Sequence, residues 1–241
     1  MRYENELGVT FDNKHTYRDY GFFPTSPFVV SPPSAKTNYV EIPNSDGSLD
    51  LTEALSDYLA YNDREYEQQF KYIGDRKRWP QLYSDFLNDV QGRLINIVSD
   101  EDLEYFWFGR VHADSVEHNG DHVYITLKGQ FEPYKYEKYS STDEWLWDEI
   151  NFETSVIRDY SNISVNNETV VVVGSKKSIV PTIIVDESDD LVLKEFNGDI
   201  LNEEMGIGQY VMPEIELHES ENYFVFEGSG IISIDFRGAS L

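Results

Sequence analysis

Residues 223–237 read Tyr-Phe-Val-Phe-Glu-Gly-Ser-Gly-Ile-Ile-Ser-Ile-Asp-Phe-Arg, and this stretch decides the fold class of the chain. Residues that favour strands lie on both sides of the Gly-Ser-Gly step, which predicts a β-hairpin with strands at 223–227 and 231–237. Further short strands, with turn residues between them, are predicted at 169–173, 182–185, 190–193 and 210–212. Many short strands with frequent turns indicate that the C-terminal half is an all-β sandwich.

One helix stands out in the N-terminal half, over residues 76–91. Its apolar side chains recur at helical spacing and form one continuous stripe, made of Trp79, Leu82, Tyr83, Phe86, Leu87 and Val90. Pro80 suits the first turn, where a missing N–H costs nothing, and Gly92 suits the position just past the end. We expect the stripe to pack against a sheet, so the N-terminal half is predicted to be α+β with one packed helix.

Strands of the N-terminal half are expected at 10–15, 38–42, 94–98, 105–111 and 123–127. Asp46-Gly47 and Asn119-Gly120 supply turn signals between them. The stretch 132–136, Glu-Pro-Tyr-Lys-Tyr, then breaks the pattern. We therefore expect a mainly β chain with two domains, at 1–137 and 138–241.

The 241-residue chain carries 45 acidic residues against 19 basic ones, a formal net charge of −26. A surface this negative repels nucleic acid and anionic membranes, so we expect specific binding to neither, although DNA could pass a negatively charged wall without sticking. The absence of cysteine excludes disulfides and thiolate chemistry. No signal peptide is visible and no apolar run approaches the ~18 residues of a membrane span, so we expect a product made in the cytoplasm.

No motif for catalysis, cofactor binding or metal binding is evident. His118 and His122 flank the predicted Asn119-Gly120 turn instead of sharing a helix face, which disfavours a zinc site. The acidic run at 186–190 lacks the spacing of an EF-hand loop, so we expect a charged loop tip there. Pairs of carboxylates can be chosen anywhere among 45 of them and do not indicate a glycosidase. We predict a non-enzymatic protein with no cofactor and no metal.

Residues 58–70 combine regularly placed aromatic side chains with a high density of charge. A long exposed hairpin arm, or a strand that contacts a partner, would explain both features, and an ordinary solvated strand is the alternative. The candidate inter-subunit contacts in this segment are Tyr58, Tyr61, Tyr66 and Phe70.

Trp145 and Trp147 lie two residues apart, so on a strand both rings would point to the same side. The pair either covers the end of the predicted sandwich or forms a platform on which a sugar stacks. A carbohydrate-binding protein is therefore the alternative function, and a glycoside hydrolase is a third.

Several stretches, by their order and spacing, resemble the distal tail protein family of bacteriophages with long, non-contractile tails. They are 15–22 (HTYRDYGF), 31–33 (SPP), 46–55 (DGSLDLTEAL), 75–79 (DRKRW), 109–111 (GRV), 132–136 (EPYKY) and 234–241 (IDFRGASL). The resemblance runs nearly from end to end.

This resemblance implies a structural protein of the phage tail tip or baseplate, located in the virion. It implies a homohexameric ring of split-barrel-like N-terminal domains around a channel, with galectin-like C-terminal sandwiches on the outside. The ring would join the tail tube protein to the tail-associated hub protein and could carry receptor-binding or side-fibre proteins. The C-terminal half lacks a large insertion, which argues against a grafted carbohydrate-binding module.

Overall fold

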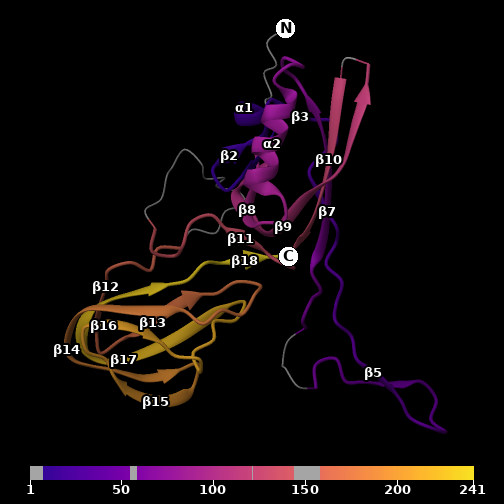
Figure 1. Cartoon of the computed structure of the whole chain (residues 1–241). Coiled ribbons are helices and arrows are strands. Elements are labelled where there is room, and N and C mark those ends of the chain that lie inside the picture. The colour runs from indigo at the N-terminus through magenta and orange to yellow at the C-terminus, as the bar shows by residue number, and fades with distance from the viewer. Residues whose placement is uncertain (1–7, 55–58, 121, 144–157) are drawn as a thin grey trace. The chain divides into compact units, whose positions relative to one another are not determined.

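The computed structural model describes residues 8–54, 59–120, 122–143 and 158–241. The chain divides into two compact units (Figure 1). Unit 1 comprises residues 1–102 and 106–133, and unit 2 comprises residues 103–105 and 134–241. Strands dominate both units, which confirms the predicted mainly β fold class, while the predicted division at about residue 137 stays a prediction. No described helix is long and apolar enough to cross a membrane.

Unit 1 is built on a large antiparallel sheet with the strand order β2-β1-β8-β9-β10-β7-β3, in which β4 also pairs with β7. The strands of this sheet are β1 (Val9–Phe11), β2 (Lys14–His15), β3 (Phe22–Pro24), β4 (Val29–Val30), β7 (Arg64–Tyr72), β8 (Leu94–Ser99), β9 (Asp102–Asn119) and β10 (His122–Phe131). The predicted turn at Asn119-Gly120 is confirmed, because it joins β9 to β10 in a hairpin. A separate hairpin pairs β5 (Tyr39–Glu41) with β6 (Ser48–Asp50).

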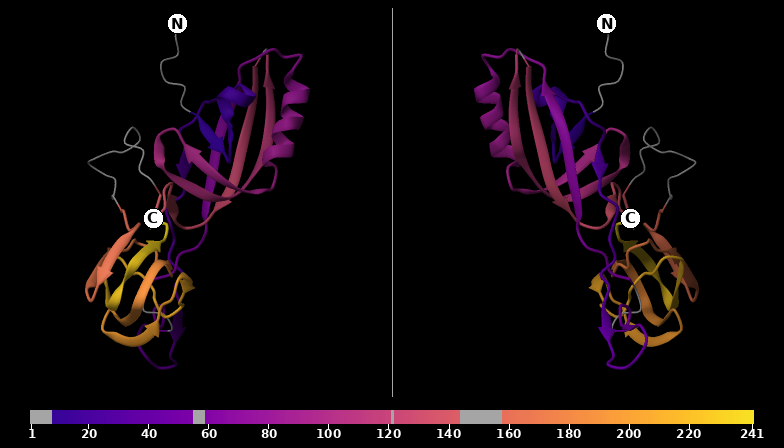
Figure 2. Two further views of the ribbon diagram at one scale, coloured as in Figure 1. Left: turned by 90° about the vertical axis from the view of Figure 1, so that its left-hand side faces the viewer. Right: turned by 90° about the vertical axis from the view of Figure 1, so that its right-hand side faces the viewer.

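Helix α2 (Trp79–Val90) covers one face of the unit 1 sheet (Figure 2). It confirms the predicted helix, although it begins at Trp79, after a turn that holds the basic residues 76–78. Phe86 is fully buried, with its ring centroid 5.0 Å from that of Phe22 and 5.1 Å from that of Tyr20. The apolar stripe of the helix therefore forms core, as its periodicity predicts.

A second, short helix, α1 (Thr16–Tyr20), was not predicted from the sequence. The Nδ1 atom of His15 accepts the N–H groups of Tyr17 and Arg18 at 3.2 Å each, so this side chain caps the helix N-terminus. The Nε2 atom of the same ring lies 2.9 Å from Oδ2 of Asp100. A helix of five residues is too short to show a helical periodicity in the sequence. It depends instead on the His15 cap, which the contact with Asp100 holds in place.

Unit 2 contains a six-stranded sheet with the order β12-β17-β14-β15, in which β13 pairs with β17 and β16 with β14. Its strands are β12 (Ile163–Asn166), β13 (Thr169–Val173), β14 (Thr182–Phe196), β15 (Asp199–Glu204), β16 (Gly208–Val211) and β17 (Glu221–Asp235), and a further pair is β11 (Lys135–Glu137) with β18 (Ala239–Ser240). The long strands β14 and β17 shift register at three places, where bulges let them bend around one apolar core.

The hairpin predicted at 223–237 is wrong, because β17 runs from Glu221 to Asp235 without a turn at Gly228-Ser229-Gly230. Its glycines serve close packing against β14 instead. A Cβ atom on Gly228 would lie 2.2 Å from the carbonyl oxygen of Asp190, and one on Gly230 would lie 2.3 Å from that of Glu187. The glycines therefore mark a bulged, tightly paired strand, which is the other known use of glycine inside a strand.

The charged loop tip predicted at 186–190 is also wrong, because these residues lie within β14. Glu187, Ser188 and Asp189 pair with residues 229–231 of β17. Asp190 adopts a left-handed backbone with φ 50°, at the bulge between Asp189 and Val192. The acidic run at 186–190 therefore marks a bulge in a paired strand, although in the sequence it looks like a turn.

Candidate assembly surface

The β5–β6 hairpin and the two chain segments that lead to it form an extension of unit 1 that we call the arm (described residues 34–54 and 59–62). Backbone hydrogen bonds from Lys36 to Ala60 and from Asn62 to Ser34 join the two segments, and Ala35 and Tyr61 form an isolated bridge. No described strand outside the hairpin pairs with β5 or β6. In Figure 1 the hairpin extends away from the sheet of its own unit.

A buried arginine fixes the base of the arm. The guanidinium of Arg64 lies over the indole ring of Trp107, 4.6 Å from its centroid, and its Nε donates to the carbonyl oxygen of Ser31. The residue is 8% exposed, and this burial lowers the pKa of the guanidinium from its ordinary value. Because Ser31 lies just before the arm and Arg64 just after it, this side chain holds the start and the end of the arm together.

The hairpin itself is held by its turn and by local polar contacts. Gly47 adopts φ 75° and Asn44 φ 65°, the left-handed backbone that these two residue types tolerate best. Beyond the turn, Oδ1 of Asp50 accepts the N–H of Thr52 at 2.9 Å, and Thr52 Oγ1 accepts the N–H of Asn38. Hydrogen bonds from Thr52 are the main cause that lowers the pKa of Asp50.

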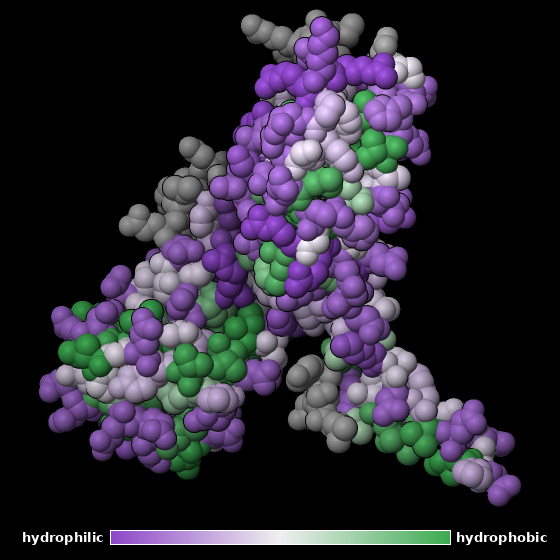
Figure 3. All heavy atoms as spheres, viewed as in Figure 1, coloured by the Kyte–Doolittle hydropathy of each residue, from purple (hydrophilic) through white to green (hydrophobic). Residues whose placement is uncertain are grey.

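One face of the hairpin is apolar and uncovered. Val40 faces Leu49 across the strands, and Ile42 lies on the same side two residues further on. These side chains are 41%, 49% and 48% exposed, and Tyr39 on the opposite face is 60% exposed. Figure 3 shows apolar surface along this hairpin. A two-stranded hairpin without a core is marginally stable in water, so this face is suited to packing against another protein surface.

The exposed arm was predicted at residues 58–70, but most of that segment is strand β7, and the arm of the structure precedes it in the chain. Strand β7, which begins at Arg64, pairs with β10 on one side and with β3 and β4 on the other, so it has no open edge. Tyr66 is 1% exposed and Phe70 0% exposed, so both rings lie in the unit 1 core and offer no contact surface. The charged residues that alternate with them face outward, which makes β7 a half-buried interior strand.

The remaining two candidates have different outcomes. Tyr61 is half-buried at the base of the arm, where a contact role stays a prediction. Tyr58 lies outside the described residues, as do Trp145 and Trp147 of the alternative sugar-binding hypothesis. The apolar residues of the arm were missed as a site, although Asp46-Gly47 between alternating apolar residues was the signal that could have found them.

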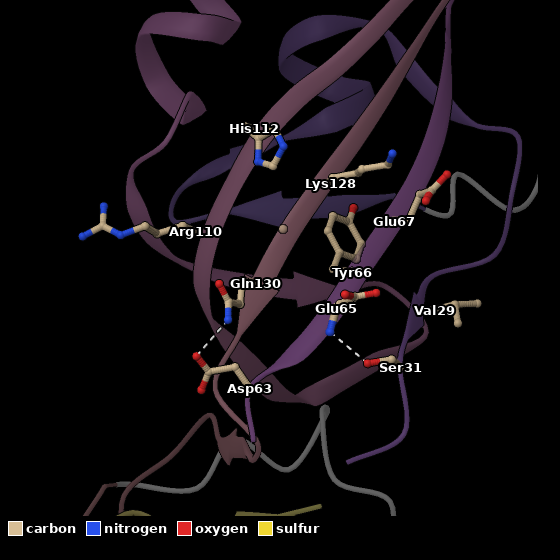
Figure 4. A pocket seen from close by; sticks show the side chains of 11 residues that line it. Val29, Ser31, Asp63, Glu65, Tyr66, Glu67, Arg110, His112, Lys128 and Gln130 are labelled. Carbon is tan, nitrogen blue, oxygen red and sulfur yellow. Dashed lines mark hydrogen bonds between the residues drawn. The ribbon is translucent and has the colours of Figure 1, made fainter. Parts of the chain in front are cut away.

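The outward face of β7, β10 and β9 is a second notable surface, an open trough lined by polar side chains (Figure 4). In one row across the sheet, Lys128 stands between Glu67 and His112, and in the next row Gln130 stands between Glu65 and Arg110. A hydrogen bond and ion pair with Asp114, at 3.0 Å, is the main cause that raises the pKa of Lys128. Lys128 is paired with Asp114, and Glu65, Glu67, Arg110 and His112 are exposed, so this face is a solvated polar surface.

The described residues show no constellation for metal binding. No group of three or more His, Asp or Glu side chains among them could hold an ion. His118 and Val123 pair across the β9–β10 hairpin, and His122 pairs with Asn119. These two histidines therefore belong to the two strands of a hairpin, as the turn signal indicates.

These features define a two-unit, mainly β chain with a projecting apolar hairpin. A scan against protein-family models gives no match, and a search of curated proteins gives none either. A search of solved structures finds the crystal structure of the Dit (gp 19.1) protein of SPP1, described as a paradigm of the hub adsorption apparatus in phages that infect Gram-positive bacteria. The match has a TM-score of 0.66 at 14% sequence identity and covers 98% of this chain and 100% of that chain. The likeness is one of fold, and it extends over both units.

Proposed function

We propose that this chain is a structural component of a phage tail tip, where six copies form a ring that joins the tail tube to the tail-associated hub. The observation that carries this proposal is the end-to-end match to SPP1 Dit, because the shared fold covers 98% of the chain and therefore includes both units. The proposed role is non-enzymatic, and receptor-binding or side-fibre proteins are the proposed peripheral partners.

The arm supports the assembly part of this proposal. A closed ring needs a contact between two different surfaces of neighbouring subunits, so that the same contact repeats around the axis. The apolar face of Val40, Ile42 and Leu49 lacks a partner among the described residues of its own chain and would gain one from a neighbouring subunit. We propose this face as one side of the inter-subunit contact.

Charge supports the proposed passage of DNA. The chain has a formal net charge of −26, and the outward face of β7, β10 and β9 presents solvated polar side chains. A wall of this kind does not hold a polyanion, so the ring would guide DNA without binding it.

The ring is tested by measuring the mass of the purified protein in solution by light scattering, at low and high salt. We expect a species near six times 28.0 kDa, favoured at high salt because salt screens repulsion between the acidic subunits. A monomer at both salt concentrations would contradict self-assembly of the ring.

A matched pair of variants tests the arm. Val40→Lys places a charge on the apolar face of the hairpin, and Val171→Lys places one on β13 of unit 2; both valines are 41% exposed. We expect Val40→Lys to yield folded monomers and Val171→Lys to retain the ring. Equal behaviour of the two variants would remove the arm from the interface.

A further inference from the structure

Strand β16 (Gly208–Val211) is an unprotected edge of the unit 2 sheet. It pairs with residues 182–185 of β14 on one side, and no described strand pairs with its other side. Backbone N–H and C=O groups of alternate residues on such an edge are available to a further strand. Natural edge strands are usually blunted by charged residues, proline or bulges, whereas the Gly-Gln-Tyr-Val sequence of β16 has none of these features.

Two large apolar side chains mark this edge. Ile207, directly before the strand, is 77% exposed, and Val211 at its end is 64% exposed. Residues 209 and 211 point to one face of the sheet, because side chains alternate along a strand. Tyr210 points the other way, packs against the unit 2 core, and its Oη donates to the carbonyl oxygen of Gly206 at 3.0 Å. Val211 therefore lies on a paired strand, and Ile207 lies directly before it.

A second strand on the same side of β14, β15, shows how this protein protects an edge strand. Strand β15 also exposes an isoleucine, Ile200, to 76%, but it carries Asp199, Glu203 and Glu204 within six residues. Charged side chains of this kind oppose the addition of another strand. The contrast between β15 and β16 indicates that the lack of charge is a specific feature of β16.

The surroundings of β16 are acidic. Glu204 lies three residues before Ile207 and Glu214 three residues after Val211, so each carboxylate is within about 11 Å of the edge along the chain. Among the described residues, neither forms an ion pair. Residues 134–241 hold 22 acidic and 7 basic residues, a formal charge of −15. A second copy of this chain would bring like charge to the edge, whereas a cationic partner would neutralise it.

We propose that β16 accepts an extended segment of a different protein, which adds a strand to the sheet. That segment would alternate apolar residues, which cover Ile207 and Val211, with lysine or arginine, which face the flanking glutamates. Main-chain hydrogen bonds supply the binding and the side chains supply the selectivity, as in other cases of strand addition. The edge belongs to unit 2 and does not depend on ring formation, so it can be tested whatever the oligomeric state.

The test uses a labelled eight-residue peptide that alternates valine with lysine, with binding followed by fluorescence anisotropy and amide hydrogen exchange. A second peptide has the same sequence but is N-methylated at alternate residues, which keeps the charge and removes the ladder hydrogen bonds. A third peptide replaces lysine with glutamate. We expect only the first to bind, and we expect new exchange protection confined to residues 207–211.

Two variants locate the binding. Val211→Lys adds a repelling charge at the edge, and we expect affinity to fall by about tenfold, the equivalent of losing one buried apolar side chain. Ile200→Lys makes the same kind of change at an exposed apolar residue of β15, which is 76% exposed against 64% for Val211. We expect this control to bind the peptide as the original chain does. Thermal unfolding of both variants checks that they remain folded.

Several results would overturn the proposal. Equal binding of the N-methylated peptide would mean that the acidic surface attracts any cation. Equal loss in Ile200→Lys, or no binding of the first peptide, would exclude the β16 edge. A fall in molecular mass on Val211→Lys without peptide present would show that the edge pairs with a second copy of the chain instead.

Discussion

The guanidinium of Arg64 lies 4.6 Å from the ring centroid of Trp107 and thereby closes the base of the arm. Its Nε also donates to the carbonyl oxygen of Ser31 on the outgoing segment. One buried side chain thus connects the core of unit 1 with the segment that carries the exposed apolar face.

We expect Arg64→Met to loosen the arm while leaving the sheet intact, because methionine keeps an apolar stem but cannot donate to Ser31. The lost cation–π contact and hydrogen bond correspond to about 1–3 kcal/mol of unfolding free energy. Limited proteolysis should cut the variant faster within residues 34–62. Arg93→Met, at an exposed position where the guanidinium donates to the carbonyl oxygen of Asp89 in α2, is the control and should leave the cutting rate within the arm unchanged. Equal cutting rates in both would show that Arg64 does not hold the arm.

Tyr20 is expected to make unit 1 less stable as the pH rises into the alkaline range. Its Oη donates to Oδ2 of Asp89 at 2.6 Å, which joins α1 to α2. Burial is the main cause that raises the pKa of this phenol, followed by the hydrogen bond with Asp89 and the negative charges of Asp89 and Asp19. A raised pKa in the folded state contributes stability below the ordinary tyrosine pKa of about 10 and loses it as the pH rises further.

We therefore expect Tyr20→Phe to be less stable than the original chain at neutral pH, by about 1 kcal/mol for one hydrogen bond. Above pH of about 10 the free energy of unfolding should fall less steeply in the variant, since one fewer proton is lost on unfolding. Urea unfolding at a series of pH values measures both effects. Parallel curves for the two proteins would show that Tyr20 does not contribute to the alkaline loss of stability.

The glycines of β17 give a third prediction. Gly230→Ala places a Cβ 2.3 Å from the carbonyl oxygen of Glu187, so the two strands must separate locally. Overpacking of this kind costs about 1–3 kcal/mol, which thermal unfolding would detect as a lower Tm. Gly206→Ala is the matched control, because its nearest neighbour would be 3.8 Å away and its φ is not positive. If both variants unfold alike, the close approach of β14 and β17 is not what requires glycine.

Local patterns predicted those elements whose signal is contained within a few turns or residues. The stripe of α2 needs only helical periodicity, and Asn119-Gly120 and Asp46-Gly47 need only the backbone preferences of their turn types. The excess of acidic residues likewise follows from composition. For the helix and the two turns, the free energy that favours the structure arises between near neighbours in the chain.

The tertiary structure decided whatever depends on strand pairing. Only pairing shows that Gly228 and Gly230 lie inside one long strand, because a glycine in a turn and a glycine in a bulge look the same in sequence. Only pairing shows that β7 is interior while β16 is open, since an edge is defined by the absence of a neighbour. The sequence determined which segments are apolar and where the Asp46-Gly47 and Asn119-Gly120 turns lie. The folded sheets determined which other turn signals lie inside strands, which apolar side chains are buried and which remain exposed for a partner.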